Sequence, residues 1–401
     1  MAERTEELMR STHWPTDPAP ADGADSPADV VRASRLLGSD PSLVLHGGGN
    51  TSVKDEGVLY VKGSGHDMSS IGPEGFAPLR RAALATLLAR DQVSDTEMVA
   101  ALRAALVDAS APNPSIEAPL HAFLPYAAVL HTHADAIVTL TDTVNGAALL
   151  DDLFGDTAPL LPYCMPGFEL ARLVRSRWPE IARGGAVGFV LAHHGAFTFG
   201  DDVRTAYERH LRLVDLAESL IAEHTGVRFV DDPHERVVDA AEDGALAAFA
   251  REVRDVVGGE VVAEAVRSDQ VDVFLDRADL AEVTSRGPTT LEHVIHTKRV
   301  PLIGRDVEQY VADYRAYFTR NRPRARMPVR MLDPMPRVVL DPELGLVGLG
   351  RTAKQARVAR DIYRHTIRVM TAAQALGGYV TTSEGEQFDM EYWELEQAKL
   401  R

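Results

Sequence analysis

The feature that most constrains this chain is the stretch Val129-Leu130-His131-Thr132-His133-Ala134-Asp135-Ala136-Ile137-Val138. An apolar run typical of a β-strand leads into two histidines that stand two positions apart. Side chains alternate along a strand, so an extended backbone places both imidazoles on one face. Two imidazoles on one face can share a metal ion, and a hydrogen-bonded surface pair is the alternative. A metal site therefore requires a third ligand and a base from elsewhere in the chain.

A second pair of histidines, His193 and His194, follows the strand predicted at residues 186–191 and precedes a glycine. Catalytic zinc needs three protein ligands and an open position, and three histidines are a common set. His131, His133 and His194 can supply that set. His193 is the competing third ligand, and spacing alone does not separate the two. A buried structural histidine is the alternative for His194.

Glu117 is the candidate base. Glu117 and His121 are four residues apart, so a helix that starts near Ser115 places both on one face. Pro119 is tolerated only within the first turn of that helix. A short turn from this helix to the histidine strand brings Glu117 close to the imidazoles, where a carboxylate can take or give a proton beside a metal. An ordinary solvated helix carboxylate is the alternative.

Two loops that contain glycines, residues 46–54 and 62–68, follow short strands predicted at 43–45 and 58–61. Glycines after a strand let the backbone turn tightly and approach a ligand with its N–H groups. Neither loop matches the Walker or the dinucleotide-binding pattern, and tight hairpin turns explain the glycines equally well.

Hydrophobic periodicity predicts the other elements. Ser94 and Glu97 form a capping-box signal for the second of two helices expected within residues 77–109. Further helices are expected at 27–37, 168–176, 203–223, 244–256, 259–265, 352–374 and 383–400, and strands at 271–275, 338–340 and 346–349, the last two forming a hairpin.

Length and composition limit the class of protein. A chain of 401 residues predicts two to three domains, here a loose arm (1–27), a catalytic domain (28–230) and a C-terminal α/β region (231–401). The net charge of −17 argues against nucleic acid as a partner. Cys164 is the single cysteine, which excludes an intrachain disulfide. An acidic N-terminus and the lack of a long apolar run predict neither signal peptide nor membrane span, hence a cytoplasmic protein.

Several short motifs occur in the order and spacing of the class II aldolase/adducin family, and the chain resembles that family from about residue 30 onward. The resemblance is closest to the aldolase part of the bifunctional rhamnulose-1-phosphate aldolase/lactaldehyde dehydrogenases. The motifs that carry it are Leu45–Lys54, Ser64-Gly65, Ser115-Ile116-Glu117, His121–Pro125, His131-Thr132-His133, His194-Gly195, Glu391-Tyr392-Trp393 and Glu396–Leu400.

The resemblance implies an α/β/α domain with a largely antiparallel central sheet, assembled as a homotetramer. It implies that His131, His133 and His194 hold Zn²⁺ or another divalent metal. His194 is favoured over His193 because the family's third ligand precedes a glycine. Glu117 would be the general acid/base at the carbon next to the carbonyl of the substrate, and the metal would stabilise an enediolate as a Lewis acid.

The resemblance also implies that the two glycine loops bind the phosphate of a sugar phosphate. The residues concerned are Gly49, Asn50, Ser64, Gly65 and Ser115. Lys54 and Lys62 could add positive charge there, with solvated surface lysines as the alternative.

The expected activity is that of a lyase that cleaves a ketose 1-phosphate, such as rhamnulose 1-phosphate, into dihydroxyacetone phosphate and an aldehyde. The alternatives are a sugar-phosphate epimerase or sugar-acid phosphate decarboxylase on the same site, and a non-enzymatic adducin-like assembly module. Ile116 replaces a serine that many short relatives carry, and Glu292 and His296 replace Asp and Arg of the long relatives. No nicotinamide fingerprint is present, so aldehyde oxidation is not expected of these residues.

Overall fold

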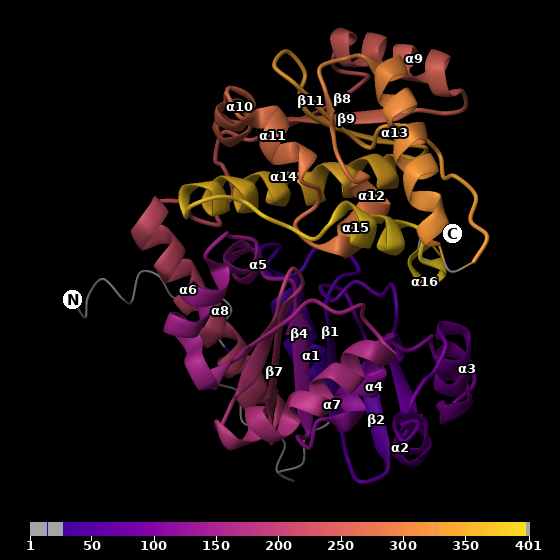
Figure 1. The fold of residues 1–401 in the computed structure, drawn as a ribbon, viewed down its shortest axis with the longest axis vertical. Helices are drawn as coiled ribbons and strands as arrows, with labels where there is room; N and C mark the ends of the chain where they lie inside the picture. Colours follow the sequence, from indigo (N-terminus) through magenta and orange to yellow (C-terminus); the bar gives the residue numbers. More distant parts are fainter. Residues whose placement is uncertain (1–13, 15–26, 326, 398–401) are drawn as a thin grey trace. The chain divides into compact units, whose positions relative to one another are not determined.

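The computed structural model describes residue 14, residues 27–325 and residues 327–397. Backbone contacts divide them into two compact units (Figure 1). Unit 1 contains the described residues up to Thr141 together with Asn145–Glu223, and unit 2 contains Asp142–Val144 and the described residues from His224 onward. The predicted N-terminal arm lies outside the described residues, except for residues 14 and 27.

Unit 1 is built on a seven-stranded sheet with the order β3-β2-β1-β4-β7-β6-β5. Every pairing in this sheet is antiparallel except that of β5 with β6. The strands are β1 (Asn50–Lys54), β2 (Val58–Lys62), β3 (Phe76–Arg80), β4 (Ala128–Thr132), β5 (Leu160–Leu161), β6 (Gly188–Leu191) and β7 (Gly195–Gly200). The histidine strand β4 therefore lies at the centre of the sheet, between β1 and β7.

Helices cover both faces of this sheet. On one face Val129 packs with residues of α4 and α7, in a core that includes Phe197 and Phe199. On the other face Thr51 contacts α1 and Thr132 contacts α8 through side-chain hydrogen bonds. The helices of this unit are α1 (Pro27–Gly38), α2 (Arg81–Leu88), α3 (Asp95–Ala105), α4 (Ala118–Phe123), α5 (Asp135–Thr141), α6 (Gly146–Phe154), α7 (Phe168–Arg183) and α8 (Val203–Thr225), with short 3-10 turns η2 (Pro73–Gly75) and η3 (Gly155–Thr157). The predicted α/β/α arrangement with a largely antiparallel central sheet is confirmed.

Two predicted elements of unit 1 are wrong. Residues 43–45 form no strand, because Asp40 closes a turn: its carbonyl accepts from the amides of Leu43 and Val44. Residues 76–80, placed partly in a helix, form β3 and pair with β2. Pro78 within β3 lacks an N–H, which is tolerated because β3 is an edge strand. The capping box at Ser94 and Glu97 is confirmed.

Unit 2 contains a five-stranded sheet with the order β10-β11-β12-β9-β8. Its strands are β8 (Arg236–Asp239), β9 (Val262–Arg267), β10 (Leu302–Ile303), β11 (Val338–Asp341) and β12 (Gly345–Gly350). The predicted hairpin of β11 and β12 is confirmed as an antiparallel pair. Its helices are α9 (Gly244–Val257), α10 (Asp269–Leu275), α11 (Leu280–Ser285), α12 (Val294–Thr297), α13 (Val307–Asn321), α14 (Ala353–Ala375), α15 (Glu384–Glu391) and α16 (Glu394–Gln397), with 3-10 turns η4 (Leu291–His293) and η5 (Arg322–Arg324).

Three predictions in unit 2 are corrected. Residues 259–265, expected to be helical, lead into β9, which pairs with β12 and β8. Residues 271–275, expected to be a strand, belong to α10, whose first turn is capped by the hydroxyl of Ser268. The helix expected at 383–400 is divided into α15 and α16. Within the described part of the chain, no helix has both the length and the apolar character needed to cross a membrane.

Lys298, at the end of α12, is buried inside unit 2. Its Nζ donates to Tyr314 Oη at 2.8 Å and to Glu391 Oε1 at 3.0 Å. Burial lowers the pKa of Lys298, and the Glu391 carboxylate opposes that shift. This lysine therefore belongs to an internal polar cluster of unit 2.

Candidate metal centre

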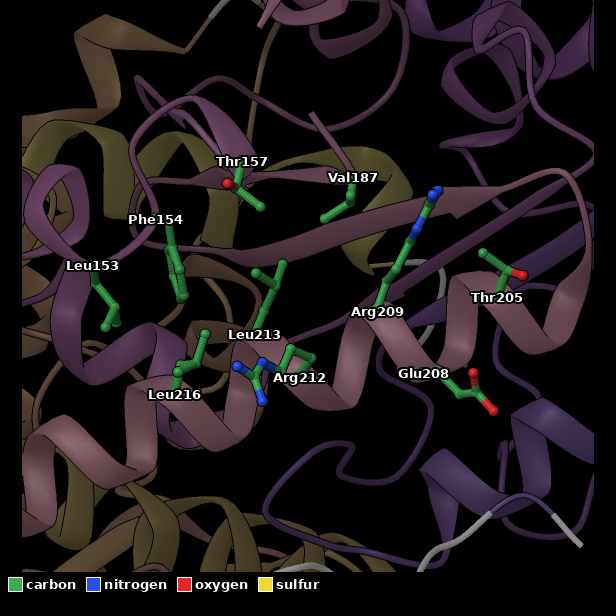
Figure 2. Close-up of a pocket in the computed structure, with 10 residues that line it drawn as sticks. All are labelled: Leu153, Phe154, Thr157, Val187, Thr205, Glu208, Arg209, Arg212, Leu213 and Leu216. Atoms are coloured by element: carbon green, nitrogen blue, oxygen red, sulfur yellow. The ribbon is translucent and has the colours of Figure 1, made fainter. Parts of the chain in front are cut away.

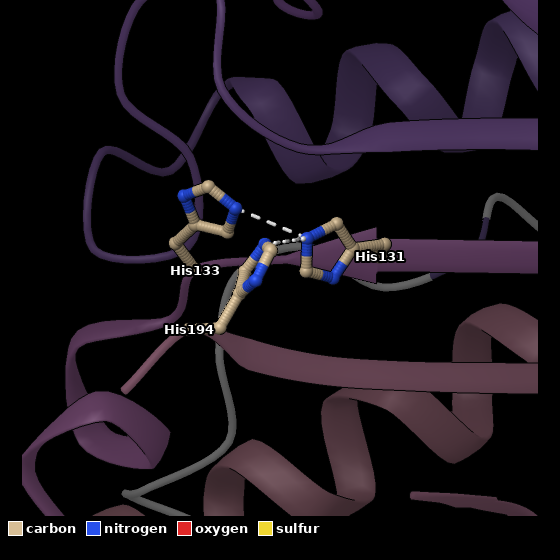
Figure 3. Close-up of side chains that lie close together, drawn as sticks. All are labelled: His131, His133 and His194. Carbon is tan, nitrogen blue, oxygen red and sulfur yellow. Dashed lines mark hydrogen bonds between the residues drawn. The ribbon is translucent and has the colours of Figure 1, made fainter. Parts of the chain in front are cut away.

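Three imidazoles converge at the end of the central strand (Figure 3). His131 belongs to β4, His133 follows the end of that strand, and His194 occupies the turn between β6 and β7. The Nε2 atom of His131 lies 3.0 Å from Nε2 of His133 and 3.2 Å from Nε2 of His194. The structure thus brings together the three histidines that the sequence singled out.

The competing ligand His193 lies outside this group. It occupies the turn with a positive φ of 55°, and its backbone N–H donates to Thr141 Oγ1 at 3.2 Å. Gly195, the next residue but one, has its Cα so close to β4 that a Cβ there would lie 2.2 Å from the carbonyl oxygen of Thr132. The turn therefore needs a glycine after His194 to approach the histidine strand.

The environment of His131 favours a neutral imidazole with Nε2 unprotonated. Its Nδ1 lies 2.9 Å from the carbonyl oxygen of Ala196, which can only accept a hydrogen bond, so Nδ1 carries the proton. Burial lowers the pKa of His131, although the nearby Glu117 carboxylate raises it. Phe197 stacks on the ring at a centroid distance of 3.9 Å and fixes its plane. An oriented, neutral imidazole is the form that ligates a metal.

The donor set fits a divalent cation. In a tetrahedral site with metal–nitrogen bonds of about 2.0–2.1 Å, neighbouring nitrogens are about 3.3 Å apart, close to the two distances observed here. Neutral histidine nitrogens that converge on one point suit Zn²⁺ and related metals better than Ca²⁺ or Mg²⁺, which prefer oxygen ligands. His131, His133 and His194 could therefore hold such an ion.

Glu117 lies beside the three imidazoles and is buried, with 4% of its surface exposed. Its Oε2 is 3.8 Å from His131 Nε2, and its Oε1 is 3.7 Å from His194 Nε2. The residue stands at the N-terminal end of α4, and Pro119 falls in the first turn of that helix, as predicted. Among the described residues, Oε1 has no hydrogen-bond donor, whereas Oε2 accepts from Asn50 Nδ2 at 2.5 Å.

The two glycine loops lie side by side. A Cβ on Gly47 would be 3.6 Å from the Cα of Gly65, and one on Gly48 would be 3.8 Å from His133 Nδ1. Gly49 has a φ of +61° and passes close to β4, because its Cβ would lie 2.8 Å from the carbonyl oxygen of His131. The first loop thus lies between the second loop and the imidazoles.

The segment before Glu117 is hydrogen-bonded to the second loop. Ser64 donates its backbone N–H to Asn113 at 2.8 Å, and the N–H of Ser115 donates to Lys62 at 3.0 Å. The Ser115 hydroxyl accepts from the backbone N–H of Glu117 at 3.2 Å. Ser64 and Gly65 are exposed, whereas Ser115 is buried. Four of the predicted phosphate-binding residues, Gly49, Ser64, Gly65 and Ser115, therefore come from adjoining segments. Asn50 differs, because it begins β1 and its side chain contacts Glu117 and His121.

Neither lysine considered for the phosphate is a solvated surface residue. Lys62 is 2% exposed, and its Nζ donates to the carbonyl oxygen of Gly47 at 3.1 Å, between the two loops. Lys54 instead donates to the carbonyl oxygens of His121 and Leu124 at the end of α4. Burial lowers the pKa of Lys54 to about 7.

A separate cavity of about 560 Å³ opens in unit 1 beside α6 and α8 (Figure 2). Phe154 and Leu213 contribute to its apolar wall, and Arg209 and Arg212 to its polar part. It contains none of the predicted site residues, so the converging histidines rather than the volume of a cavity define the candidate site.

Sequence reasoning missed the role of β1. Asn50, Ser52 and Lys54 lie on one face of this strand and all contact His121. The signal was present, because polar residues at alternate positions of a strand are unusual on a buried face. His121, the residue that these three side chains contact, was noted only because it stands four positions after Glu117.

Two family descriptions match this chain. Residues 28–221 match the class II aldolase and adducin N-terminal domain, and residues 242–400 match the second domain of class II aldolases. Together these matches cover most of the sequence.

One relative and two solved structures are similar to parts of this chain. A Bacillus subtilis (strain 168) protein named uncharacterized oxidoreductase YuxG is 32% identical over 403 residues, which cover 93% of this chain and 58% of that protein. The chain thus spans little more than half the length of this curated relative. The N-terminal class II aldolase domain of a conserved protein from Thermoplasma acidophilum is 39% identical, with a TM-score of 0.45, over 52% of this chain and all of that one. The L-fuculose-1-phosphate aldolase of Thermus thermophilus is 16% identical, with a TM-score of 0.35, over 49% of this chain and 92% of that one.

Proposed function

The chain belongs to the class II aldolase and adducin family, and on that premise we propose that it is a metal-dependent aldolase that cleaves a ketose 1-phosphate. The products would be dihydroxyacetone phosphate and an aldehyde. The observation that carries this proposal is the approach of Glu117 to within 4 Å of two of three converging imidazoles. A non-enzymatic assembly module has no need of such a set.

His131, His133 and His194 would hold the divalent cation, Zn²⁺ in our proposal. When bound, such an ion polarises the carbonyl of the substrate and stabilises negative charge on its oxygens as a Lewis acid. His131 suits this purpose because the Ala196 carbonyl and Phe197 orient its ring, and burial lowers its pKa and so favours the neutral form.

Glu117 would move the proton. Cleavage breaks the bond between C3, the carbon next to the ketose carbonyl, and C4. The C4 hydroxyl loses its proton and becomes the carbonyl of the released aldehyde, and the electron pair of the broken bond stays on C3 of the dihydroxyacetone phosphate half as an enediolate. Protonation of that carbon then completes the product. Oε1 of Glu117, which has no donor among the described residues, is the atom available for this transfer.

The adjoining loops would bind the phosphate. Gly49, Gly65 and the neighbouring residues offer backbone N–H groups, and Ser64 and Ser115 offer hydroxyls. Lys62 adds a positive charge between the loops. Phosphate held there would fix the distance between the sugar and the imidazoles.

The experiment is a screen of ketose 1-phosphates for release of dihydroxyacetone phosphate, coupled to a dehydrogenase, with products identified by NMR. We expect cleavage by the wild type, none by His131→Ala, and loss of turnover of about 10²- to 10⁴-fold in Glu117→Gln with metal content retained. Elemental analysis identifies the metal. Undiminished cleavage by His131→Ala would contradict the proposal, and a single isomerised product would replace it with epimerisation.

A further inference from the structure

One face of strand β1 is both polar and buried. Asn50, Ser52 and Lys54 alternate on that face, and each is less than a tenth exposed. All three contact one residue of α4, His121, which is itself fully buried. Asn50 Oδ1 lies 2.6 Å from His121 Nε2, Ser52 Oγ lies 2.7 Å from Nδ1, and Lys54 Nζ donates to the His121 carbonyl oxygen at 2.6 Å.

The Glu117 carboxylate sets the direction of these hydrogen bonds. An ionised carboxylate only accepts, so the Asn50 amide must turn its N–H₂ group toward Glu117 Oε2. The amide oxygen of Asn50 then faces His121, and because that oxygen also only accepts, His121 Nε2 must carry a proton. In a neutral imidazole Nδ1 is then an acceptor, and the Ser52 hydroxyl donates to it.

The imidazole of His121 is suited to remain neutral. Burial lowers its pKa well below the usual value, and the positive charge of nearby Lys54 acts in the same direction. A neutral ring has one donor and one acceptor, so the tautomer chosen by Ser52 and Asn50 is the only one that satisfies both partners.

We infer that His121 is a positioning residue that fixes the orientation of the Asn50 amide. In that orientation Asn50 Nδ2 donates to Oε2 of Glu117, and Oε1 is left for the reaction. This inference rests on the proposed function. Without the N–H of His121, the Asn50 amide can rotate and present its oxygen to the carboxylate, which repels it. Oε1 would then leave its place 3.7 Å from His194 Nε2.

The test compares two substitutions of His121 in the full chain. His121→Leu removes the donor, and we expect kcat to fall about 100-fold, as displacement of a catalytic group by an ångström does, while KM changes little. His121→Gln restores an N–H at the position of Nε2 and should recover most of that loss. Metal content should be the same in both variants. Equal kcat values for His121→Leu and the wild type would overturn the inference.

Thr51→Val is the matched control. Thr51 lies on the opposite face of β1, where its Oγ1 is 2.6 Å from Ser34 Oγ, so the substitution removes one buried hydrogen bond of the same strand. We expect thermal stability to fall and kcat to be unchanged. A loss of kcat in Thr51→Val equal to that in His121→Leu would assign the effect to strand stability and overturn the positioning role.

A second measurement needs neither substrate nor a folded His121→Leu variant. ¹⁵N NMR of labelled wild type, with the His121 signal assigned by difference from His121→Gln, should show the Nε2–H tautomer. Ser52→Ala leaves the Asn50 oxygen facing Nε2 and should therefore keep the same tautomer. A wild-type Nδ1–H tautomer overturns the inference even in an active enzyme. A wild type with the Nε2–H tautomer that cleaves no ketose phosphate contradicts the proposed function while it supports the hydrogen-bond direction.

Discussion

At the scale of single residues, His193 and His194 are adjacent in sequence, but only His194 belongs to the group of converging imidazoles. His193 has a positive φ and lies outside the group of imidazoles. The next residue, His194, lies within that group, beside His131 and His133. Spacing could not separate the two histidines, because the choice is made by the shape of a three-residue turn. The proximity of His131 and His133 was predictable, because residues two apart in an extended segment place their side chains on the same face.

We predict that divalent metal stabilises the protein through His194 and not through His193. A ligand that binds the folded state contributes about 2.7 kcal/mol at a concentration of 100 Kd. That gain should be lost in His194→Asn and kept in His193→Asn, where asparagine tolerates the positive φ. Thermal unfolding with and without Zn²⁺ measures both, and a retained shift in His194→Asn would contradict the ligand assignment.

Gly195 is the residue that allows β7 to approach β4. A Cβ at this position would meet the Thr132 carbonyl oxygen at 2.2 Å and His133 Cα at 3.1 Å. We predict that Gly195→Ala lowers the free energy of unfolding by about 1–3 kcal/mol and weakens metal binding, because the backbone between two ligands must shift. Gly57→Ala, whose Cβ would meet Asp55 Oδ1 only at 3.9 Å, is the control and should leave metal affinity unchanged. Calorimetric titration of Zn²⁺ into both variants measures the metal affinity and tests this prediction.

At the scale of elements, local patterns were reliable where the helix or strand signal was strong. The capping box of α3 and the hairpin of β11 and β12 follow from residues that are neighbours in sequence. The strand predicted at residues 271–275 is wrong. Val271, Phe274 and Leu275 are buried on one face of a helix, while Val273 is 69% exposed. Five residues are too few to distinguish this helical pattern from the alternation of a strand. The contact of Asn50 with Glu117 joins residues 67 positions apart, and only the packing of β1 against α4 creates it.

Lys54 links β1 to the end of α4 and gives stability a dependence on pH. Burial lowers its pKa in the folded state to about 7, below the ordinary value of 10.5. Between these values the unfolded chain holds one more proton, so stability rises with pH, by at most about 1.4 kcal/mol per pH unit from this group. We predict that this rise is present in the wild type between pH 7 and 10 and is reduced in Lys54→Met. Urea unfolding over that range measures it, and equal slopes would contradict the prediction.

At the scale of the whole molecule, the sequence predicted the α/β class and the largely antiparallel sheet, because ordered motifs and periodicity reach that level. It could not supply the order of the strands in unit 2, since pairings such as that of β9 with β12 join residues about 80 positions apart. The domain boundary that we propose at residue 230 is close to the contact-based division at Glu223.

We predict that a fragment of residues 28–230 binds a divalent metal with the affinity of the full chain. All three imidazoles and Glu117 belong to unit 1, so the proposed ligands are complete in this fragment. Circular dichroism and zinc titration of the fragment test this. A folded fragment without metal affinity would show that the centre needs the rest of the chain.

The central position of β4 also bears on how such a protein changes over evolutionary time. The imidazoles and Glu117 are anchored to the middle of the sheet, where Asn50 stands directly opposite His131 in the strand register. The adjoining glycine loops lie at strand ends, where insertions and substitutions disturb less of the core. Under the proposed function, the reaction would therefore be inherited with the scaffold, while the choice of sugar would be free to drift at its edge. Directed evolution confined to residues 46–48 and 64–68, which leaves Gly49 and Gly63 unchanged, would sample new substrates on the same proposed reaction.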